Sequence, residues 1–388
     1  MDIDHPRLAV VTPDRDAISE SFINAHIEGL LENPVVIWGS PRPLFVVGRD
    51  SVLSGVPRAL ARTLSLGWRM DTLRAHGAVG RRLPMPLYSR EMARFLRHAQ
   101  IDIVLAEYGT TAVEIVEACS ISETPLVVHF HGFDAYQEET VNRLSQSYDR
   151  LFQTAARIIV VSEDMRERLL GLGGSPERVI CNPCGVNVDI FRGSDPLTAP
   201  PLLLALGRFV EKKGPLLTLQ AFSLVLAEEP DARLVMLGDG VLRSECVNTA
   251  RQLGIQRKVE FPGPVNHNEV VAWMCRARCF VQHSQRARDG DSEGTPVAVL
   301  EASSCGLPVV STKHGGIVDA VVEGQGGFLV DEGDVEAMAQ HILEFIRDPA
   351  LAATMGEAGR RHIVSNYSAE TSLSRLRAVL LAAARECP

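Results

Sequence analysis

The chain has 388 residues, of which 46% are hydrophobic and 22% charged, and its formal net charge is −9. This composition is typical of a globular protein and excludes a disordered or collagen-like chain, while the acidic balance argues against a nucleic-acid binder. The N-terminus has no apolar signal core, and no run approaches the roughly 18 apolar residues of a transmembrane helix. We therefore expect a cytoplasmic protein of two or three domains.

Apolar runs that predict buried strands alternate with helical patterns along the first half of the chain. Runs that are apolar throughout are typical of parallel strands covered on both faces. Residues 19–31, between the first two runs, predict an amphipathic helix with Ser19 as its N-cap. The expected strands are 8–13, 34–38, 43–48, 101–109, 124–132 and 156–164.

The alternation restarts after residues 193–201, a Pro- and Ser-containing stretch that predicts a linker. The expected strands of this second half are 201–207, 232–240, 258–263, 278–284, 307–312 and 326–330, and helical segments follow to the end. This order predicts two doubly wound, Rossmann-like α/β domains, 1–192 and 193–367, with a ligand cleft at the carboxyl ends of the strands. We expect the final helix, about 368–388, to join the first domain.

Two turns in the second half carry residues suited to phosphates. Arg208 and Lys213 follow a strand end and Gly207, where cations suit a diphosphate, although a solvated loop explains them equally well. The next strand ends in a Gly-Asp-Gly turn at 238–240. That turn either brings the backbone close to a ligand or is a simple strand-to-helix turn.

A third segment places two glutamates, Glu293 and Glu301, eight residues apart. If Gly294 and Thr295 open a helix with Pro296 in its first turn, the two carboxylates share one helical face. The free N–H groups at such a helix end attract phosphate oxygens. Glu301 would lie about 12 Å deeper along the axis, where a carboxylate accepts hydrogen bonds from both hydroxyls of a ribose. A surface salt bridge is the other interpretation.

The order GRFVEKKG, LGDG, EGTPVAVLEASSCGLPVV and GGI resembles the retaining glycosyltransferases of family 4, which have the GT-B fold. The resemblance is strongest over about 190–365. The loop DGDSEGTPVAVLEA and the segment ISESFINAHI are also similar to the bacterial exopolysaccharide branch, of colanic-acid and amylovoran type. This resemblance implies transfer of a hexose from a nucleotide-sugar, UDP-hexose first and GDP-mannose second. The acceptor would be a sugar hydroxyl on a lipid-linked or soluble glycan, and no metal or other cofactor is expected.

The resemblance also implies roles for individual residues. Arg208 and Lys213 would bind the donor diphosphate, Glu301 the ribose, and Glu293 the donor sugar or its phosphate. His131, after a strand end of the first half, would lie near the donor sugar. The resemblance further implies donor contacts at Gly238, Gly294, Thr295 and Pro296. Acceptor candidates are Ser19, Glu20, Ser21 and Asp134, since TPDRDAISES stands where many family members have a Gly-Gly loop.

Other interpretations concern metals and reaction class. Asp289-Gly290-Asp291 is formally a DxD metal motif, but we expect it to be solvated or to face the donor sugar. The cysteine pairs 181/184 and 275/279 have spacings compatible with zinc, yet such pairs are often incidental in reduced proteins. The alternatives in function are a different GT-B sugar-nucleotide enzyme such as an epimerase, a transferase acting on a small-molecule acceptor, or a binding protein without catalysis.

An arginine-rich segment, residues 57–98, carries nine arginines against two acidic residues, a local charge of +7. Leucines and a tryptophan interleave with the arginines at positions 60, 64, 68 and 73, as in helices that lie on anionic bilayers. We expect peripheral attachment to the inner face of the plasma membrane. The other interpretation is a solvated helical face, or arginines that pair with the acidic remainder of the protein.

Overall fold

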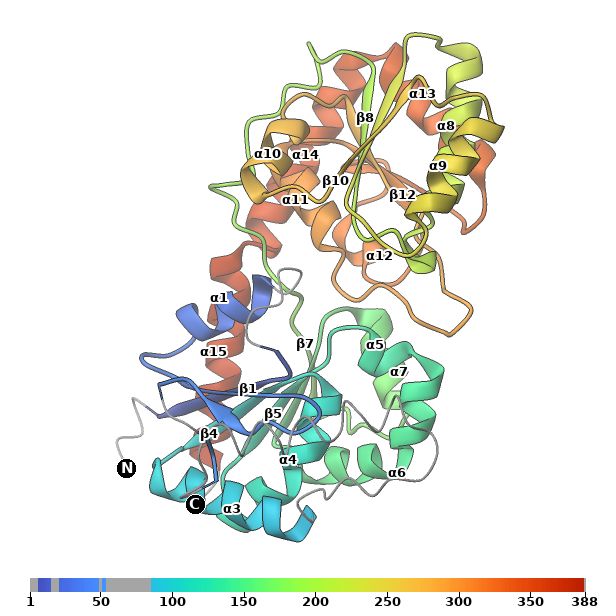
Figure 1. Cartoon of the computed structure of the whole chain (residues 1–388). Coiled ribbons are helices and arrows are strands. Elements are labelled where there is room, and N and C mark those ends of the chain that lie inside the picture. Colours follow the sequence, from blue (N-terminus) through green and yellow to red (C-terminus); the bar gives the residue numbers. More distant parts are fainter. Residues whose placement is uncertain (1–5, 15–20, 49–50, 54–84, 387–388) are drawn as a thin grey trace, which may run out of the picture.

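The computed structural model describes residues 6–14, 21–48, 51–53 and 85–386. It has two lobes, each built on one sheet with helices on both faces (Figure 1). The α/β architecture expected from the sequence is confirmed. None of the helices in the described residues is long and apolar enough to cross a membrane.

The first lobe contains a seven-stranded sheet in the order β3-β2-β1-β4-β5-β6-β7. All neighbouring pairs are parallel except β2 and β3. All six strands predicted for this half are present, and the short β7 is an addition. The strands are β1 (Leu8–Thr12), β2 (Val35–Trp38), β3 (Phe45–Val46), β4 (Ile103–Glu107), β5 (Leu126–His129), β6 (Arg157–Val160) and β7 (Val179–Cys181).

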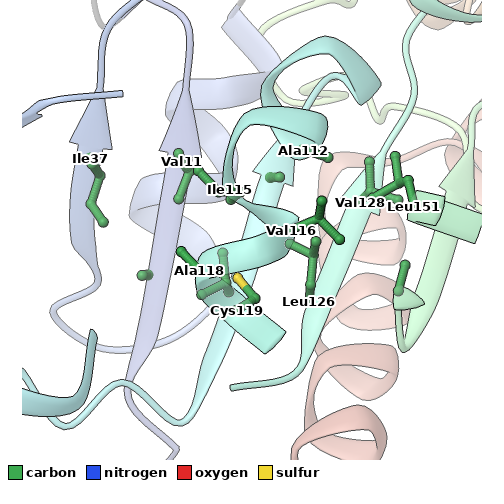
Figure 2. Close-up of a cluster of buried hydrophobic side chains, with 14 of the residues drawn as sticks. Val11, Ile37, Ala112, Ile115, Val116, Ala118, Cys119, Leu126, Val128 and Leu151 are labelled. Carbon is green, nitrogen blue, oxygen red and sulfur yellow. The ribbon is translucent and has the colours of Figure 1, made fainter. Parts of the chain in front are cut away.

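Helices cover both faces of this sheet. On one face, Ile115 and Val116 of α4 pack against Val128 of β5, and all three are nearly inaccessible to solvent (Figure 2). Burying each such side chain contributes about 1.5–3 kcal/mol, which fixes the helices relative to the strand ends. The helices are α1 (Ser21–Gly29), α3 (Met85–His98), α4 (Gly109–Ser122), α5 (Phe133–Tyr136), α6 (Glu138–Thr154) and α7 (Glu163–Gly171).

The second lobe contains a six-stranded, fully parallel sheet in the order β10-β9-β8-β11-β12-β13. All six strands predicted for this half are present. They are β8 (Leu202–Leu206), β9 (Arg233–Leu237), β10 (Val259–Gly263), β11 (Cys279–Val281), β12 (Val309–Thr312) and β13 (Gly327–Val330).

Both faces of the second sheet are also covered. In each lobe the order of neighbouring strands reverses beside β1 or β8, which is where doubly wound sheets bind ligands. The helices are η1 (Glu211–Lys213), α8 (Pro215–Glu228), α9 (Arg243–Gln252), α10 (His267–Met274), α11 (Val297–Cys305), α12 (Ile317–Ala320), α13 (Val335–Arg347) and α14 (Pro349–Asn366).

The final helix, α15 (Ala369–Glu386), returns to the first lobe and lies along its sheet (Figure 1). Its buried side chains Leu376 and Leu380 belong to the same apolar cluster as Leu8 of β1 and Leu105 of β4. The chain therefore passes between the lobes twice, once before β8 and once after α14.

Candidate active site

A turn at the carboxyl end of β5 carries His131 and Gly132. Asp134 fixes this turn: its Oδ1 accepts from the backbone N–H of His131 at 3.1 Å and of Gly132 at 2.9 Å. Its Oδ2 accepts from the N–H of Gly109 at 2.8 Å. The side chain is fully buried, and this burial raises its pKa. Asp134 therefore orders the turn and exposes no oxygen to an acceptor, in contrast to the acceptor role expected from the sequence.

The His131 ring is buried on the first-lobe side of the turn. Its Nε2 donates to Glu107 Oε2 at 2.7 Å, and His26 Nδ1 donates to the other oxygen of the same carboxylate at 2.7 Å. Glu107, at the end of β4, is completely buried. Burial alone would raise the pKa of Glu107, but His26 and His131 outweigh it and hold that pKa well below its usual value. Because its ring is buried, His131 faces the cleft with its backbone more than with its ring.

A loop of the second lobe, residues 289–296, closes against this turn. A Cβ at Gly294 would lie 2.2 Å from the carbonyl oxygen of His131, so only glycine permits the contact. Thr295 Oγ1 donates to the carbonyl of Val161 at 3.2 Å and accepts from the N–H of Cys184 at 3.0 Å. Gly294 and Thr295 thus hold the two lobes together at the cleft.

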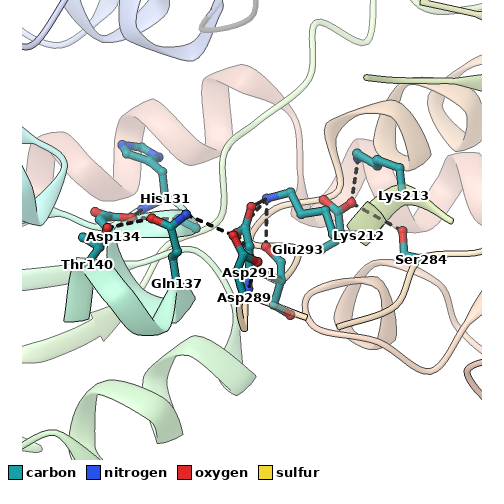
Figure 3. A network of polar contacts seen from close by, with 12 residues as sticks. His131, Asp134, Gln137, Thr140, Lys212, Lys213, Ser284, Asp289, Asp291 and Glu293 are labelled. Atoms are coloured by element: carbon teal, nitrogen blue, oxygen red, sulfur yellow. Dashed lines mark hydrogen bonds and ion pairs between the residues drawn. The ribbon is translucent and has the colours of Figure 1, made fainter. Parts of the chain in front are cut away.

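Two lysines from η1 pair with acidic residues of this loop (Figure 3). Lys213 Nζ lies 2.8 Å from Glu293 Oε1, and Lys212 Nζ donates to Asp291 at 3.0 Å and to the carbonyl of Ser292 at 3.1 Å. Glu293 is buried, yet Lys213 and then Lys212 keep its pKa below the usual value. Lys213 and Lys212 therefore compensate the negative charges of Glu293 and Asp291.

His314, in the turn after β12, supports the loop from behind. Its Nε2 accepts from the backbone N–H of Glu293 at 3.1 Å and lies 2.9 Å from Ser292 Oγ. Because Nε2 accepts, the proton sits on Nδ1, which donates to Glu332 at 2.5 Å. These bonds fix both the tautomer of His314 and the path of the loop.

Glu301 lies on the second turn of α11 and is 8% exposed. Among the described residues its side chain makes no hydrogen bond or ion pair, and burial raises the pKa of Glu301 to about 8 although Lys213 opposes the shift. The prediction that Glu293 shares this helix is wrong, because α11 begins at Val297. Proline disfavours the helical conformation of the residue before it, so Pro296 keeps Thr295 and the preceding loop out of the helix.

Arg208, beyond the end of β8, is exposed, and within the described chain it has no charged partner. Below it, the Gly-Asp-Gly turn packs on the neighbouring strand end, since a Cβ at Gly238 would lie 2.1 Å from the carbonyl oxygen of Gly207. Gly238 also has φ +120°, which favours glycine. This packing on Gly207 explains the glycine at 238, and the approach to a ligand expected there stays a prediction.

Some sequence predictions lie outside the described residues. They concern Ser19, Glu20 and the part of the arginine-rich segment before residue 85. Ser21 is described and is the first residue of α1. The remainder of that segment forms α3, where Arg94 pairs with Glu91 and Arg97 donates to the carbonyl of Ile121.

The two aspartates of the formal metal motif pair with other side chains. Asp291 pairs with Lys212, and Asp289 accepts from Gln137 of the first lobe at 3.0 Å. The cysteines within the described residues are all free thiols. Cys184 lies 3.9 Å from His131 Nδ1.

Glu107, His26 and Lys212 were not predicted from the sequence. Lys212 is adjacent to the predicted Lys213, but its contacts are with residues 79 and 80 positions away. Glu107 ends a predicted strand, and a carboxylate in an otherwise apolar strand was the available signal, because such a group needs a partner when buried.

Comparisons with known proteins agree with this arrangement. The family described as "Glycosyl transferases group 1" matches residues 189–362, and "Glycosyltransferase Family 4" matches 59–190. A putative colanic acid biosynthesis glycosyltransferase, WcaL of Escherichia coli, is 30% identical over 284 residues, covering 72% of this chain and 69% of the relative. The chain belongs to the family 4 glycosyltransferases.

Other relatives place this transferase in the exopolysaccharide branch and confirm its fold. WcaL of Salmonella typhimurium is 31% identical over 63% of this chain and 62% of the relative. The Anabaena protein Alr3699/HepE, solved with UDP and glucose, superimposes with a TM-score of 0.74 at 17% identity, covering 97% of this chain and 100% of that one. The GT-B fold expected from the sequence is thereby confirmed.

Proposed function

We propose that this transferase is a retaining hexosyltransferase that uses a nucleotide-sugar donor. The acceptor is a sugar hydroxyl of a lipid-linked or soluble glycan in bacterial exopolysaccharide or glycoconjugate synthesis. The observation that carries the proposal is Glu301, a buried carboxyl without a hydrogen-bond partner in the described residues. Burying a carboxyl without a partner is costly, so such a group marks a site completed by a ligand.

The surroundings of Glu301 fit a nucleoside diphosphate. A carboxylate accepts two charge-assisted hydrogen bonds from a ribose diol. Lys213 lies within electrostatic reach of Glu301, and Arg208 stands exposed beyond the end of β8. A carboxylate for the ribose diol and two cations for the phosphates match the two parts of a nucleoside diphosphate.

The pairing of nearby carboxylates supports a front-face displacement. Glu293 is bound to Lys213, and Asp134 accepts three backbone N–H groups. A carboxylate engaged in this way is a poor covalent nucleophile. We propose that the sugar C1–O bond loosens while Arg208 and Lys213 neutralise the leaving diphosphate, which takes the proton of the acceptor hydroxyl. The product then keeps the anomeric configuration of the donor, which NMR of the product measures.

We also propose that transfer needs no metal ion. Asp291 of the formal metal motif is paired with Lys212, and its neighbour Asp289 accepts from Gln137. Cations of the protein would compensate the diphosphate instead. Full activity in EDTA is the expected result, and a strict requirement for Mg²⁺ or Mn²⁺ would contradict it.

The donor is a UDP-hexose in this proposal, with GDP-mannose second. The Anabaena structure contains UDP and glucose, whereas a Mycolicibacterium smegmatis relative, 31% identical over 61% of this chain, is named a GDP-mannose-dependent mannosyltransferase. Screening the purified chain against UDP-glucose, UDP-galactose and GDP-mannose, for binding and for slow hydrolysis, separates the two. A preference for GDP-mannose would overturn the choice of UDP.

The acceptor side of the proposal includes a lipid surface. The local charge of +7 over 57–98 supports contact between the first lobe and anionic lipids, where each cation adds about 1 kcal/mol. Acceptors carried on a lipid would then be presented to the cleft from the membrane. Liposome flotation, described below, tests this part independently of the donor.

A further inference from the structure

Residues 286–290 of the second lobe are fastened to the start of α6 in the first lobe. Gln137 Nε2 donates to Asp289 Oδ2 at 3.0 Å, and the backbone N–H of Glu138 donates to the carbonyl oxygen of Asp289 at 2.9 Å. Arg286 forms an ion pair with Glu138 at 3.0 Å. In Figure 3 the side chains of Gln137 and Asp289 face each other across the boundary between the lobes. These contacts form an interlobe clasp between residues 137–138 and 286–290.

Gly290 allows the two backbones of the clasp to meet. It has φ +83°, and a Cβ there would lie 2.7 Å from Cγ of Glu138 and 2.9 Å from the carbonyl oxygen of Tyr136. The loop is compact, because the N–H of Gly290 donates to the carbonyl of Ala287, and that of Ala287 to the carbonyl of Asp291, each at 2.9 Å. A side chain at position 290 would therefore push this loop away from α6.

The clasp also completes the first turn of α6. The first N–H groups of a helix have no partner within that helix. Gln137 is the N-cap residue of α6, but in the described structure its side chain caps none of these N–H groups. Its Oε1 accepts from Thr140 Oγ1 at 2.6 Å instead. The carbonyl of Asp289 therefore satisfies a helix donor of the first lobe from the second lobe.

The position of Asp289 is transmitted along the loop towards Glu293, which follows it by four positions in the sequence. Asp289 Oδ1 accepts from the backbone N–H of Asp291 at 3.1 Å. Lys212 then binds Asp291 and the carbonyl of Ser292. A displacement of Asp289 therefore displaces the residue that faces the donor sugar in the proposed function. Misplacing a group of an active site by about 1 Å can cost about 10²-fold in rate.

We propose that Asp289 and Gln137 are positioning residues, which align the loop carrying Glu293 with the donor sugar when the two lobes are in contact. The clasp lies beside α5, away from the two places where the chain crosses between the lobes (Figure 1). Contact with the first lobe thus orders the donor loop of the second lobe, and the acidic motif acts as an interlobe contact. The consequence for turnover rests on the proposed function, whereas the clasp itself does not.

Hydrogen exchange tests the clasp without turnover. The amide of Glu138 donates to the other lobe, so it should exchange slowly in the unmodified chain and fast in Gly290→Ala. The matched control is Gly254→Ala, which has φ +73° and no atom of the described residues within 4 Å of an added Cβ. It should leave the exchange of Glu138 unchanged. Exchange of this amide at the unprotected rate in the unmodified chain, with and without UDP, would overturn the proposal.

A reciprocal exchange of side chains separates positioning from metal binding. Gln137→Glu places a second carboxylate against Asp289, and this repulsion should lower kcat about tenfold while the affinity for UDP changes less than about twofold. Adding Asp289→Asn should recover most of the lost kcat, because the new amide donates to the new carboxylate. The bonds from Asp291 and Thr140 are kept in the double variant. A double variant less active than Gln137→Glu alone would contradict the positioning role and favour a metal ligand.

Turnover is measured as release of nucleoside diphosphate from UDP-glucose, UDP-galactose and GDP-mannose. Gly290→Ala should lower kcat about 10²-fold, and Gly254→Ala should leave it unchanged. Full kcat in Gly290→Ala, despite a Glu138 amide that has lost its protection, would show that the clasp does not position Glu293. Absence of turnover in the unmodified chain with all three donors would count against the proposed function, and the exchange of Glu138 would still decide whether the clasp exists.

Discussion

Nucleotide binding should release a proton from Glu301. With a pKa of about 8, roughly nine-tenths of this carboxyl is protonated at pH 7 in the free protein. The ribose hydroxyls donate to the carboxylate and so favour its charged form, which means that binding must ionise the group. The apparent affinity for UDP should then rise about tenfold between pH 7 and pH 9, as the ionised fraction rises from about one-tenth to about nine-tenths.

Calorimetry in buffers of different ionisation enthalpy measures this directly. We expect about 0.9 proton released per bound UDP at pH 7, falling to about 0.1 at pH 9. Glu301→Gln is the matched control, because it keeps the side-chain size and retains any proton change that belongs to the phosphates or other residues. It should bind with a loss of about 1–3 kcal/mol and without the extra proton. If the variant and the unmodified chain release the same number of protons, Glu301 does not bind the ribose.

Four further predictions concern the stability of the free protein, the two cations, the contact between the lobes and the membrane. Without nucleotide, Glu301→Gln should stabilise the protein above pH 8 and not below pH 4.5, by roughly 5 kcal/mol for the gap between pKa values of about 8 and 4.5, in denaturant titrations at both pH values. Arg208→Ala should lower turnover about 10²–10³-fold at unchanged Tm, whereas Lys213→Ala should also lose about 3 kcal/mol of stability, because it leaves Glu293 buried without its partner. An unaffected turnover in Arg208→Ala would remove its phosphate role. Gly294→Ala should abolish transfer while preserving UDP binding, since the added Cβ separates the lobes; normal transfer would contradict that need for contact. In flotation at low salt, the chain should rise with anionic but not neutral liposomes, and replacement of Arg90, Arg94 and Arg97 by Gln should weaken binding; equal behaviour with both lipids would exclude the membrane role.

The sheets were predictable because their strands are continuous apolar runs, a pattern that parallel strands require on both faces. β7, a strand of three residues, was not among the predicted strands, whereas the comparably short β3 and β11 lie within longer predicted segments. Three site residues could be predicted because each lies close in sequence to a recognisable element. Arg208 and Lys213 follow a predicted strand, and Glu301 lies in a predicted helix. Their roles stay predictions until binding is measured.

The missed features depend on distant partners. Glu107 meets His26 from 81 residues away and His131 from 24 residues away, and no local pattern carries either contact. Asp134 follows a strand end like a ligand-binding residue, but three backbone N–H groups surround it only once β4 and β5 are paired. The prediction that a helix contains Glu293 is wrong for a local reason. Pro296 was expected within the first turn of that helix, but it excludes the preceding residues from the helix.

The return of α15 to the first lobe has a consequence for biosynthesis. Leu376 and Leu380 cover part of the face of the first sheet to which Leu8 and Leu105 belong, and they leave the ribosome after the whole second lobe. The second lobe needs no segment after Tyr367, the residue that follows α14, to complete its two apolar clusters. Although domains usually mature in the order of synthesis, here the second lobe can finish first while the first waits for its cover. A nascent chain arrested before residue 369 should therefore expose an apolar surface on its N-terminal half and attract chaperones there.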